Sequence, residues 1–361
     1  MLDYGQSRTD AYSYCLVNPF TLQETGEMLE GIEGDGNITY GTDTDNGYSA
    51  SLKVMGSQTI NQLVRIKHTV TLDDGSQDAE TLGTFFVDGT SSTWRRGIVT
   101  QSLQCYSTMY RLSQDVLESD FTRPAGYNIV QEVQELVEAD GGLLRVLPGV
   151  ETGREHTIDI WFDVGTNKKS VLDQIGSWTS CEVGVDDEGY ITWGPYVAPL
   201  DRALTYTFVN GQNCVYEPGM DLDDTRSDAV NRVVAHFSRE SKASDDPYGL
   251  ADSVVVDLPD TEPYSYRVIG RHKTYDLEVS EPCTHDELTA QALRYLDSHK
   301  GSNTYIQISH VGIPRLRAGD VVRYINYEDG EQMVDRICMV DQISMTLGKL
   351  CMCSTKLLVL S

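Results

Sequence analysis

The last third of the chain alternates strand-like and helical segments in an order that restricts what it can fold into. A strand-like run at residues 229–238 leads through an acidic loop to a second run at residues 264–269. Residues 284–299 predict a helix, because Thr284 and Glu287 occupy the two positions of a capping box. This part shows no polar residues spaced for catalysis. We therefore expect this part to have a structural role and to contact neighbouring proteins.

The predicted helix has one apolar side, and strands follow it to the last residues. Gly319 and Asp320 mark one turn between these strands, and Asp329 and Gly330 mark the next. The pattern predicts a meander that follows the helix. The apolar side carries Leu288, Ala292, Tyr295 and Leu296, and the strands are expected at residues 305–311, 321–327, 336–347 and 350–358.

The first hundred residues predict short strands separated by turns rich in glycine, aspartate and asparagine. The clearest pair is a hairpin, in which residues 65–72 alternate, residues 73–76 supply the turn and residues 81–87 return. Many short strands at this spacing favour a barrel or a sandwich. Further strands are expected at residues 13–17, 37–40, 49–55 and 97–105.

Residues 106–200 change to a mixed pattern of helices and strands. Three helices are expected, with Ser107, Asn128 and Ser170 as the residues that start them. A hairpin with an acidic turn at residues 186–189 follows. This region therefore reads as an α+β unit placed between two β-rich regions.

These patterns predict an α+β fold that is mainly β, with two tube-like β-barrel domains and an α+β domain inserted between them. The first β-barrel is expected at residues 1–105, the α+β domain at 106–200, and the second β-barrel, with its helix at 284–299, at 201–361. Residues 241–247 are expected to form a mobile loop, because they are short polar residues ending in proline.

The net charge of −27, from 55 acidic and 28 basic residues, excludes several kinds of partner. Nucleic-acid binding depends on Lys and Arg that neutralise phosphates, and no basic run is present. The same balance argues against docking on anionic lipid. The charge fits a soluble, self-repelling surface. We expect no membrane anchor and no signal peptide, since the first residues lack a basic segment and an apolar core.

The eight cysteines are spread without a pairing rhythm, which predicts buried thiols made in a reducing compartment. The close pair Cys351 and Cys353 would need partners from elsewhere in the chain to bind a metal, and we expect no metal and no cofactor. The acidic residues 221–228 lack the glycine and the closing glutamate of a calcium loop. They are predicted to form a solvated turn.

No enzyme class is supported by the motifs. The seven histidines form no metal-binding pattern, and neither a nucleophile elbow nor a phosphate-binding glycine loop is present. The chain has 20 tyrosines against seven phenylalanines. Tyrosine is common in strands, in interfaces and in carbohydrate grooves. No catalytic residue is predicted.

Three stretches, taken in their order along the chain, resemble the tail hub proteins of phages and contractile injection systems. They are residues 82–88 followed by Trp94, residues 169–178 with the hairpin at 182–195, and the unit at 229–358. The resemblance implies a homotrimer in which two β-barrels from each subunit form a ring. Such a hub sits in the virion tail, is assembled in the host cytoplasm, and lies at the distal end of the tail tube.

The resemblance also implies partners and an interface. The partners are other copies of the chain, the tail tube or distal tail protein, a spike, fibre or tip protein, and the tape-measure protein, with DNA only in transit through the lumen. Because the last strands reach Ser361, we expect no wall-degrading domain in this chain. The trimer contacts are expected at Thr84, Phe85, Phe86, Val87, Val321, Val322, Arg323 and Tyr324.

Two other functions stay open at this point. A β-rich carbohydrate-binding or receptor-binding tail module would share the acidic, tyrosine-rich composition, but it has no use for the inserted α+β unit. A glycosidase would use two turn carboxylates that lie about 5–10 Å apart in a cleft. The candidates are Asp73, Asp74, Asp186, Asp187 and Glu188.

Overall fold

The structure, a computed structural model, describes most of the chain. The predicted mobile loop at residues 241–247, the cap residue Thr284 and the turn at Asp329 and Gly330 lie outside the described residues. The described residues are 7–33, 36–42, 47–56, 58–157, 159–210, 215–216, 221–225, 229–237, 253–262, 264–279, 285–299, 303–328 and 331–360.

Every strand predicted in the first hundred residues is confirmed. In β4, Ala50, Leu52 and Val54 are buried while Lys53 is exposed, which is the alternation that a strand with one buried face requires. The seven strands are β1 (Arg8–Val17), β2 (Glu24–Met28), β3 (Gly36–Gly41), β4 (Tyr48–Met55), β5 (Leu63–Leu72), β6 (Gln77–Arg95) and β7 (Ile98–Ser107).

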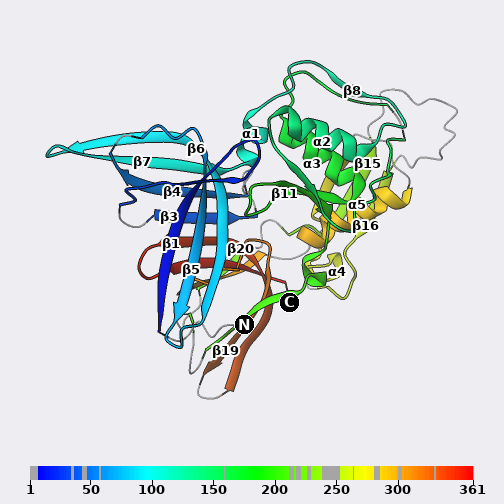
Figure 1. The fold of residues 1–361 in the computed structure, drawn as a ribbon. Coiled ribbons are helices and arrows are strands. Elements are labelled where there is room, and N and C mark those ends of the chain that lie inside the picture. The colour runs from blue at the N-terminus through cyan, green and yellow to red at the C-terminus, as the bar shows by residue number, and fades with distance from the viewer. Residues whose placement is uncertain are drawn as a thin grey trace.

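Strands from the two ends of the chain join in one 13-stranded sheet, seen on the left and at the bottom of Figure 1. Its order is β14-β18-β21-β20-β3-β4-β7-β6-β5-β1-β2, and β19 pairs with both β20 and β13. The late strands are β13 (Leu204–Val209), β14 (Asp221–Thr225), β18 (Asn303–Val311), β19 (Val321–Glu328), β20 (Glu331–Leu347) and β21 (Met352–Val359).

The described strand pairs form an open path and close neither half into a barrel. The reason lies in β20, which is 17 residues long. Its last residues, 342–347, extend beyond its pairing with β19 and pair antiparallel with β3. The two β-rich regions therefore share one core, in which Leu52 and Phe85 belong to the same buried cluster as Tyr324 and Val340.

Arginine side chains connect the early strands to the segment between β18 and β19. Arg8 of β1 donates a hydrogen bond to the carbonyl oxygen of Gly312 at 2.6 Å. Arg315 forms ion pairs with Asp78 and Glu80 of β6, each at 2.8 Å. The early strands are thus held to the C-terminal part by side chains as well as by the β20–β3 pairing.

The inserted unit, seen at the upper right of Figure 1, has its own core of helices and short strands. The predicted cap Asn128 is confirmed, since its side chain accepts a hydrogen bond from the Gln131 N–H. The third helix starts earlier than predicted, because Asn167 rather than Ser170 is its cap. The elements are α1 (Met109–Gln114), β8 (Phe121–Arg123), α2 (Ile129–Ala139), β9 (Leu144–Val146), β10 (Ile160–Phe162), α3 (Lys168–Thr179), β11 (Cys181–Val185), β12 (Ile191–Pro195) and a 3-10 turn, η1 (Pro199–Asp201).

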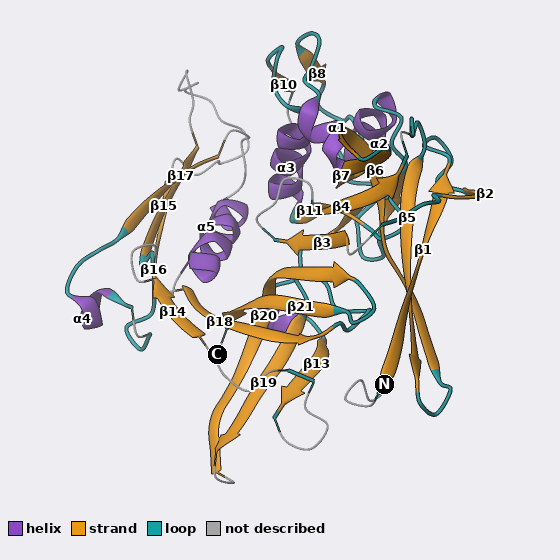
Figure 2. Cartoon of the chain, turned by 90° about the vertical axis from the view of Figure 1, so that its left-hand side faces the viewer, coloured by secondary structure: helices purple, strands orange, loops and turns teal. Residues whose placement is uncertain are grey.

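A small outer unit holds the predicted C-terminal helix, visible beside its three strands in Figure 2. The helix buries Leu288, Ala292 and Leu296 against Val233 and Ala235. The run at residues 264–269 contains a short helix, and a strand after it was not predicted. The elements are β15 (Arg232–Phe237), β16 (Ser253–Asp257), α4 (Tyr266–Ile269), β17 (Thr274–Val279) and α5 (His285–His299). No described helix has the length and apolarity needed to cross a membrane.

The acidic segment predicted as a solvated turn is in part a strand. Its first five residues form β14, which pairs with β18 at one end of the sheet path. Charged residues are common on edge strands, because they discourage pairing with a foreign strand. The rest of the segment, residues 226–228, lies outside the described residues.

Candidate interaction surfaces

The acidic turn between β11 and β12, at residues 186–189, fixes the inserted unit to the large sheet. Arg65 of β5 donates a hydrogen bond to the carbonyl oxygen of Glu188 at 2.8 Å. The Thr84 hydroxyl of β6 donates to the carbonyl oxygen of Asp187 at 2.9 Å. The sheet thus holds the main chain of this turn directly.

Arg317 adds the C-terminal part of the chain to the same junction. Its guanidinium forms a bidentate ion pair with the Asp187 carboxylate, with N···O distances of 3.0 Å, and donates a hydrogen bond to the Thr81 carbonyl oxygen at 2.7 Å. It also lies over the Tyr40 ring. Burial opposes its charge, but Tyr40 and Asp187 outweigh that effect and raise the pKa of Arg317. One side chain therefore joins β6, the inserted unit and the segment before β19.

The remaining carboxylates of the turn are also engaged in ion pairs. Arg145 binds Asp186 and Glu188, the latter at 2.7 Å. Burial raises the pKa of Asp186, and Arg145 opposes that rise. Asp74 lies in another turn, where it accepts hydrogen bonds from Ser76. These ion pairs and turn hydrogen bonds give the carboxylates a structural role that involves no catalysis.

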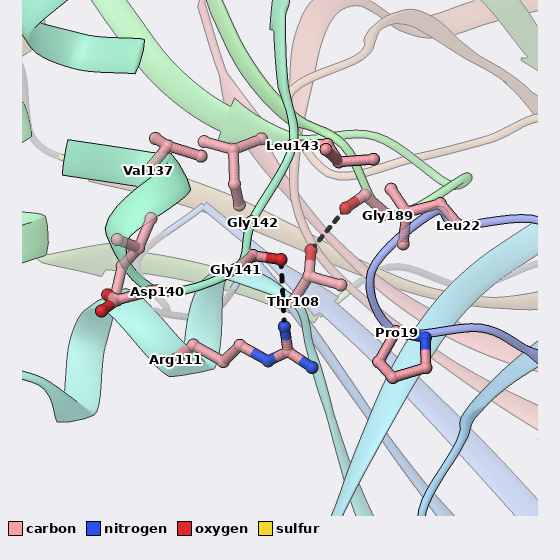
Figure 3. A pocket seen from close by; sticks show the side chains of 12 residues that line it. Pro19, Leu22, Thr108, Arg111, Val137, Asp140, Gly141, Gly142, Leu143 and Gly189 are labelled. Atoms are coloured by element: carbon pink, nitrogen blue, oxygen red, sulfur yellow. Dashed lines mark hydrogen bonds between the residues drawn. The ribbon is translucent and has the colours of Figure 1, made fainter. Parts of the chain in front are cut away.

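A small pocket lies where the inserted unit meets the early strands, as Figure 3 shows. The Thr108 hydroxyl donates to the Gly189 carbonyl oxygen at 2.8 Å, and Arg111 donates to the Gly141 carbonyl oxygen at 3.4 Å (Figure 3). The enclosed space is about that of one water molecule. It is a packing junction and has no room for a substrate.

The four predicted contact residues on β6 lie on a strand with a neighbour on each side. β5 pairs with Thr84 and Phe85, and β7 pairs with Phe85, Phe86 and Val87, so each of the four residues has at least one strand partner within this chain. Thr84 and Phe85 are fully buried, whereas Phe86 and Val87 are partly exposed. Only the side chains of Phe86 and Val87 are accessible to another protein.

The four predicted contact residues on β19 have a similar setting. β19 lies between β13 and β20. Val321, Val322 and Tyr324 are buried. Arg323 is exposed and forms an ion pair with Asp335 at 2.6 Å. Of these four, Arg323 alone offers its side chain to a partner.

The far end of the β6–β7 hairpin is an exposed surface that the sequence prediction missed. Figure 1 shows the hairpin projecting from the sheet. Every residue from 90 to 95 is exposed, and Trp94 and Ile98 are 75% and 54% exposed. Arg95 and Arg96 stand between them, and the turn at Arg96 and Gly97 has positive φ angles, as a tight hairpin turn requires. The end of this hairpin is therefore apolar and basic on an acidic chain.

Comparison with solved structures gives matches along almost the whole chain. The tail protein from Neisseria meningitidis MC58 matches with a TM-score of 0.68 and 13% identity, covering 97% of this chain and 96% of that one. The 43 kDa tail protein of prophage MuSo2 from Shewanella oneidensis matches with a TM-score of 0.63 and 11% identity, covering 97% and 98%. The prophage tail protein gp18 from Listeria monocytogenes EGD-e matches with a TM-score of 0.58 and 12% identity, covering 95% and 94%.

These matches confirm the resemblance to phage tail proteins at the level of the fold. No protein-family model matches the chain, and no curated protein matches its sequence. The order of an early β region, an inserted α+β unit and a late β region is therefore shared with tail proteins at low sequence identity.

Proposed function

We propose that this chain, which has the fold of phage tail proteins, is a structural subunit of the tail and forms a trimeric hub at its distal end. One observation carries the proposal. The similar tail proteins are covered almost completely, and so is this chain. The whole arrangement of its parts, rather than one common module, is that of a tail protein. Since those neighbours are tail proteins, a structural role is favoured over an enzymatic one.

In the proposed hub, three copies supply two β-rich regions each, which gives six similar positions around a channel. Such a ring continues a sixfold tail tube or distal tail protein on one side and presents threefold symmetry to a spike, fibre or tip protein on the other. Ring closure covers strands that are edges in one chain, here β2 and β14. The domain division at residues 105 and 200 belongs to this proposal.

The β6–β7 hairpin supplies a contact between neighbouring copies in this hub. A two-stranded ribbon exposed on both faces is only marginally stable in water, so a surface to lie on stabilises it. Trp94 and Ile98 bring apolar area, and Arg95 and Arg96 bring positive charge. Another copy of this chain, with its net charge of −27, is complementary to that end.

The acidic excess has a further role in the proposed hub. Negative charge that faces the channel repels the phosphates of DNA and lets the DNA and the tape-measure protein pass without sticking. A channel lined by lysine and arginine in a structure of the ring would contradict this part of the proposal.

The proposal is tested by the mass of the purified protein in solution, measured by light scattering with and without the tail tube protein and followed by averaged electron micrographs. We expect three chains per particle and a central hole. Particles that stay monomeric even with the tube protein present contradict the hub. Monomers that bind sugars on a glycan array favour the carbohydrate-binding tail module instead.

A further inference from the structure

Three side chains that can bind a metal meet in the core between the early strands and the C-terminal part. Asp10 comes from β1, His68 from β5, and Cys351 directly precedes β21. All three are buried, with exposed fractions of 8%, 0% and 0%. One carboxylate oxygen, one imidazole nitrogen and the sulfur lie within 4.8 Å of one another. Donors attached to one Zn²⁺ lie about 3.3–3.8 Å apart, given bonds of about 2.0–2.3 Å.

The histidine of this cluster keeps one ring nitrogen without a partner. His68 Nε2 lies 2.7 Å from Asp10 Oδ1, whereas His68 Nδ1 has no hydrogen-bond partner among the described residues. The Tyr12 ring stacks on the imidazole and fixes its plane. A fully buried imidazole nitrogen without a partner costs about 1–3 kcal/mol. Because Nε2 is the nitrogen that faces Asp10, it is the one that would share a metal with the Asp10 carboxylate.

A second thiol stands beside the first. Cys353 is buried two residues after Cys351, on the same side of the extended chain. Its sulfur is not one of the three donor atoms that lie within 4.8 Å of one another, so it would have to move towards them to complete a set of four ligands.

The surroundings of Cys351 leave room for its sulfur and balance charge. Gly312 packs against it, and a Cβ at that position would lie 2.2 Å from the Cys351 sulfur. Arg8 forms an ion pair with Asp10 at 3.1 Å. With both thiols ionised, the formal charges of Zn²⁺, Arg8, Asp10, Cys351 and Cys353 sum to zero, which removes the main cost of burying them.

We propose that Asp10, His68, Cys351 and Cys353 form a structural zinc site. One carboxylate, one imidazole and two thiolates are a donor set that suits tetrahedral Zn²⁺, and all four positions filled by protein is the pattern of a structural site. The sequence analysis expected no metal, because Cys351 and Cys353 had no visible partners. The fold supplies them from β1 and β5, more than 280 positions away in the sequence.

The site would tie the first strand of the chain to its last part. Asp10 and Cys351 are 341 positions apart, and the Cys351 N–H already donates to Asp10 Oδ2 at 3.3 Å. A metal that holds both ends binds only the folded chain, so its binding free energy stabilises the fold. We expect the metal to be present in the protein as isolated and to raise its melting temperature.

The test uses untagged full-length protein expressed with zinc in the medium and purified without chelator. Elemental analysis by mass spectrometry is expected to find about one zinc per chain. Removing the metal with a chelator lowers the melting temperature, and adding zinc back restores it. A zinc content near zero, with a melting temperature that chelator and zinc leave unchanged, shows a hydrogen-bonded polar cluster only and overturns the proposal.

Variants locate the metal. Cys351→Ser and Cys353→Ser are expected to lose the zinc, and Cys105→Ser, another buried thiol outside the cluster, is expected to keep it. Cobalt exchanged into the wild-type protein should give the near-ultraviolet charge-transfer band of thiolate–Co²⁺ bonds, and that band should weaken in Cys353→Ser. If Cys351→Ser holds as much zinc as the wild type, or the cobalt band is absent, the site is not this one. The wild-type measurements decide the matter even if a cysteine variant fails to fold.

Discussion

Arg315 and Arg317 stand two positions apart and reach the same strand, yet their surroundings differ. The Arg315 side chain is 65% exposed and pairs with the buried Asp78 and the partly exposed Glu80 of β6. The Arg317 side chain is 19% exposed and joins three parts of the chain through Asp187, the Thr81 carbonyl and the Pro314 carbonyl. Surface ion pairs contribute little to stability, whereas losing one partner of a buried pair is costly.

We therefore expect the Arg317→Met substitution to lower the free energy of unfolding by about 2–3 kcal/mol, because it leaves Asp187 and buried carbonyl oxygens without their donor. The matched Arg315→Met substitution is expected to cost less than Arg317→Met, because the Arg315 guanidinium lies largely in solvent, although it also takes one partner from the buried Asp78 carboxylate. Urea unfolding followed by circular dichroism measures both. Equal losses in the two variants would show that the junction does not depend on Arg317.

The pKa of Cys105 leads to a prediction about alkaline pH. Burial raises it from 9.0 to about 12, so the unfolded thiol ionises first as the pH rises. Its contribution to stability is complete below pH 9 and is lost as the pH rises towards 12. By pH 10.5 the loss amounts to about 2 kcal/mol.

The Cys105→Ser variant has no such thiol. We expect it to be less stable than the wild type at pH 7.5, because a buried hydroxyl replaces the sulfur. Between pH 7.5 and 10.5 its free energy of unfolding should fall by about 2 kcal/mol less than that of the wild type. Urea unfolding at the two pH values provides the measurement, and parallel losses would contradict the prediction.

Among the elements, the β6–β7 hairpin has an end whose residues are all exposed. If it lies on another copy in the hub, the Trp94→Ser substitution should prevent trimer formation and leave the melting temperature of the chain almost unchanged, because surface substitutions cost about 0.5 kcal/mol or less. Trp161 of β10 is 72% exposed and serves as the matched control. Light scattering on both variants checks the prediction; a Trp94→Ser protein that remains trimeric would show that the hairpin is not the contact.

The helices and strands that could be predicted are those with one buried face and one solvent-exposed face. Alternation revealed β4 and β5, and the cap and apolar stripe revealed α2. The outer half of β6 has no buried face, so no alternation marks it as a strand. Within β17, the residues from Thr274 to Asp276 are exposed, so this segment also lacks the alternation that predicts a strand. Asn167 was missed as a cap because Ser170 is an equally good cap residue, and only the fold selects between them.

For the whole molecule, the mainly β, α+β fold class could be predicted, but the joining of the β-rich regions in one open sheet, in place of the two expected barrels, could not. The β20–β3 pairing connects residues about 300 positions apart, and no local pattern encodes such a partner. The same limit applies to the cluster of Asp10, His68 and Cys351 and to the junction at Arg317. Each depends on segments that meet only after folding. Among the eight predicted interface residues, Thr84, Phe85, Val321, Val322 and Tyr324 are buried within the chain, and the trimer contacts stay a prediction.

The shared strand β20 also determines how a mechanical load crosses the molecule. Hydrogen bonds between antiparallel strands run across the strand direction, so a pull along β20 strains all its bonds to β3 together. A pull at right angles would break them one at a time. Because both β-rich regions use this strand, a load on the early strands reaches the late strands through main-chain hydrogen bonds.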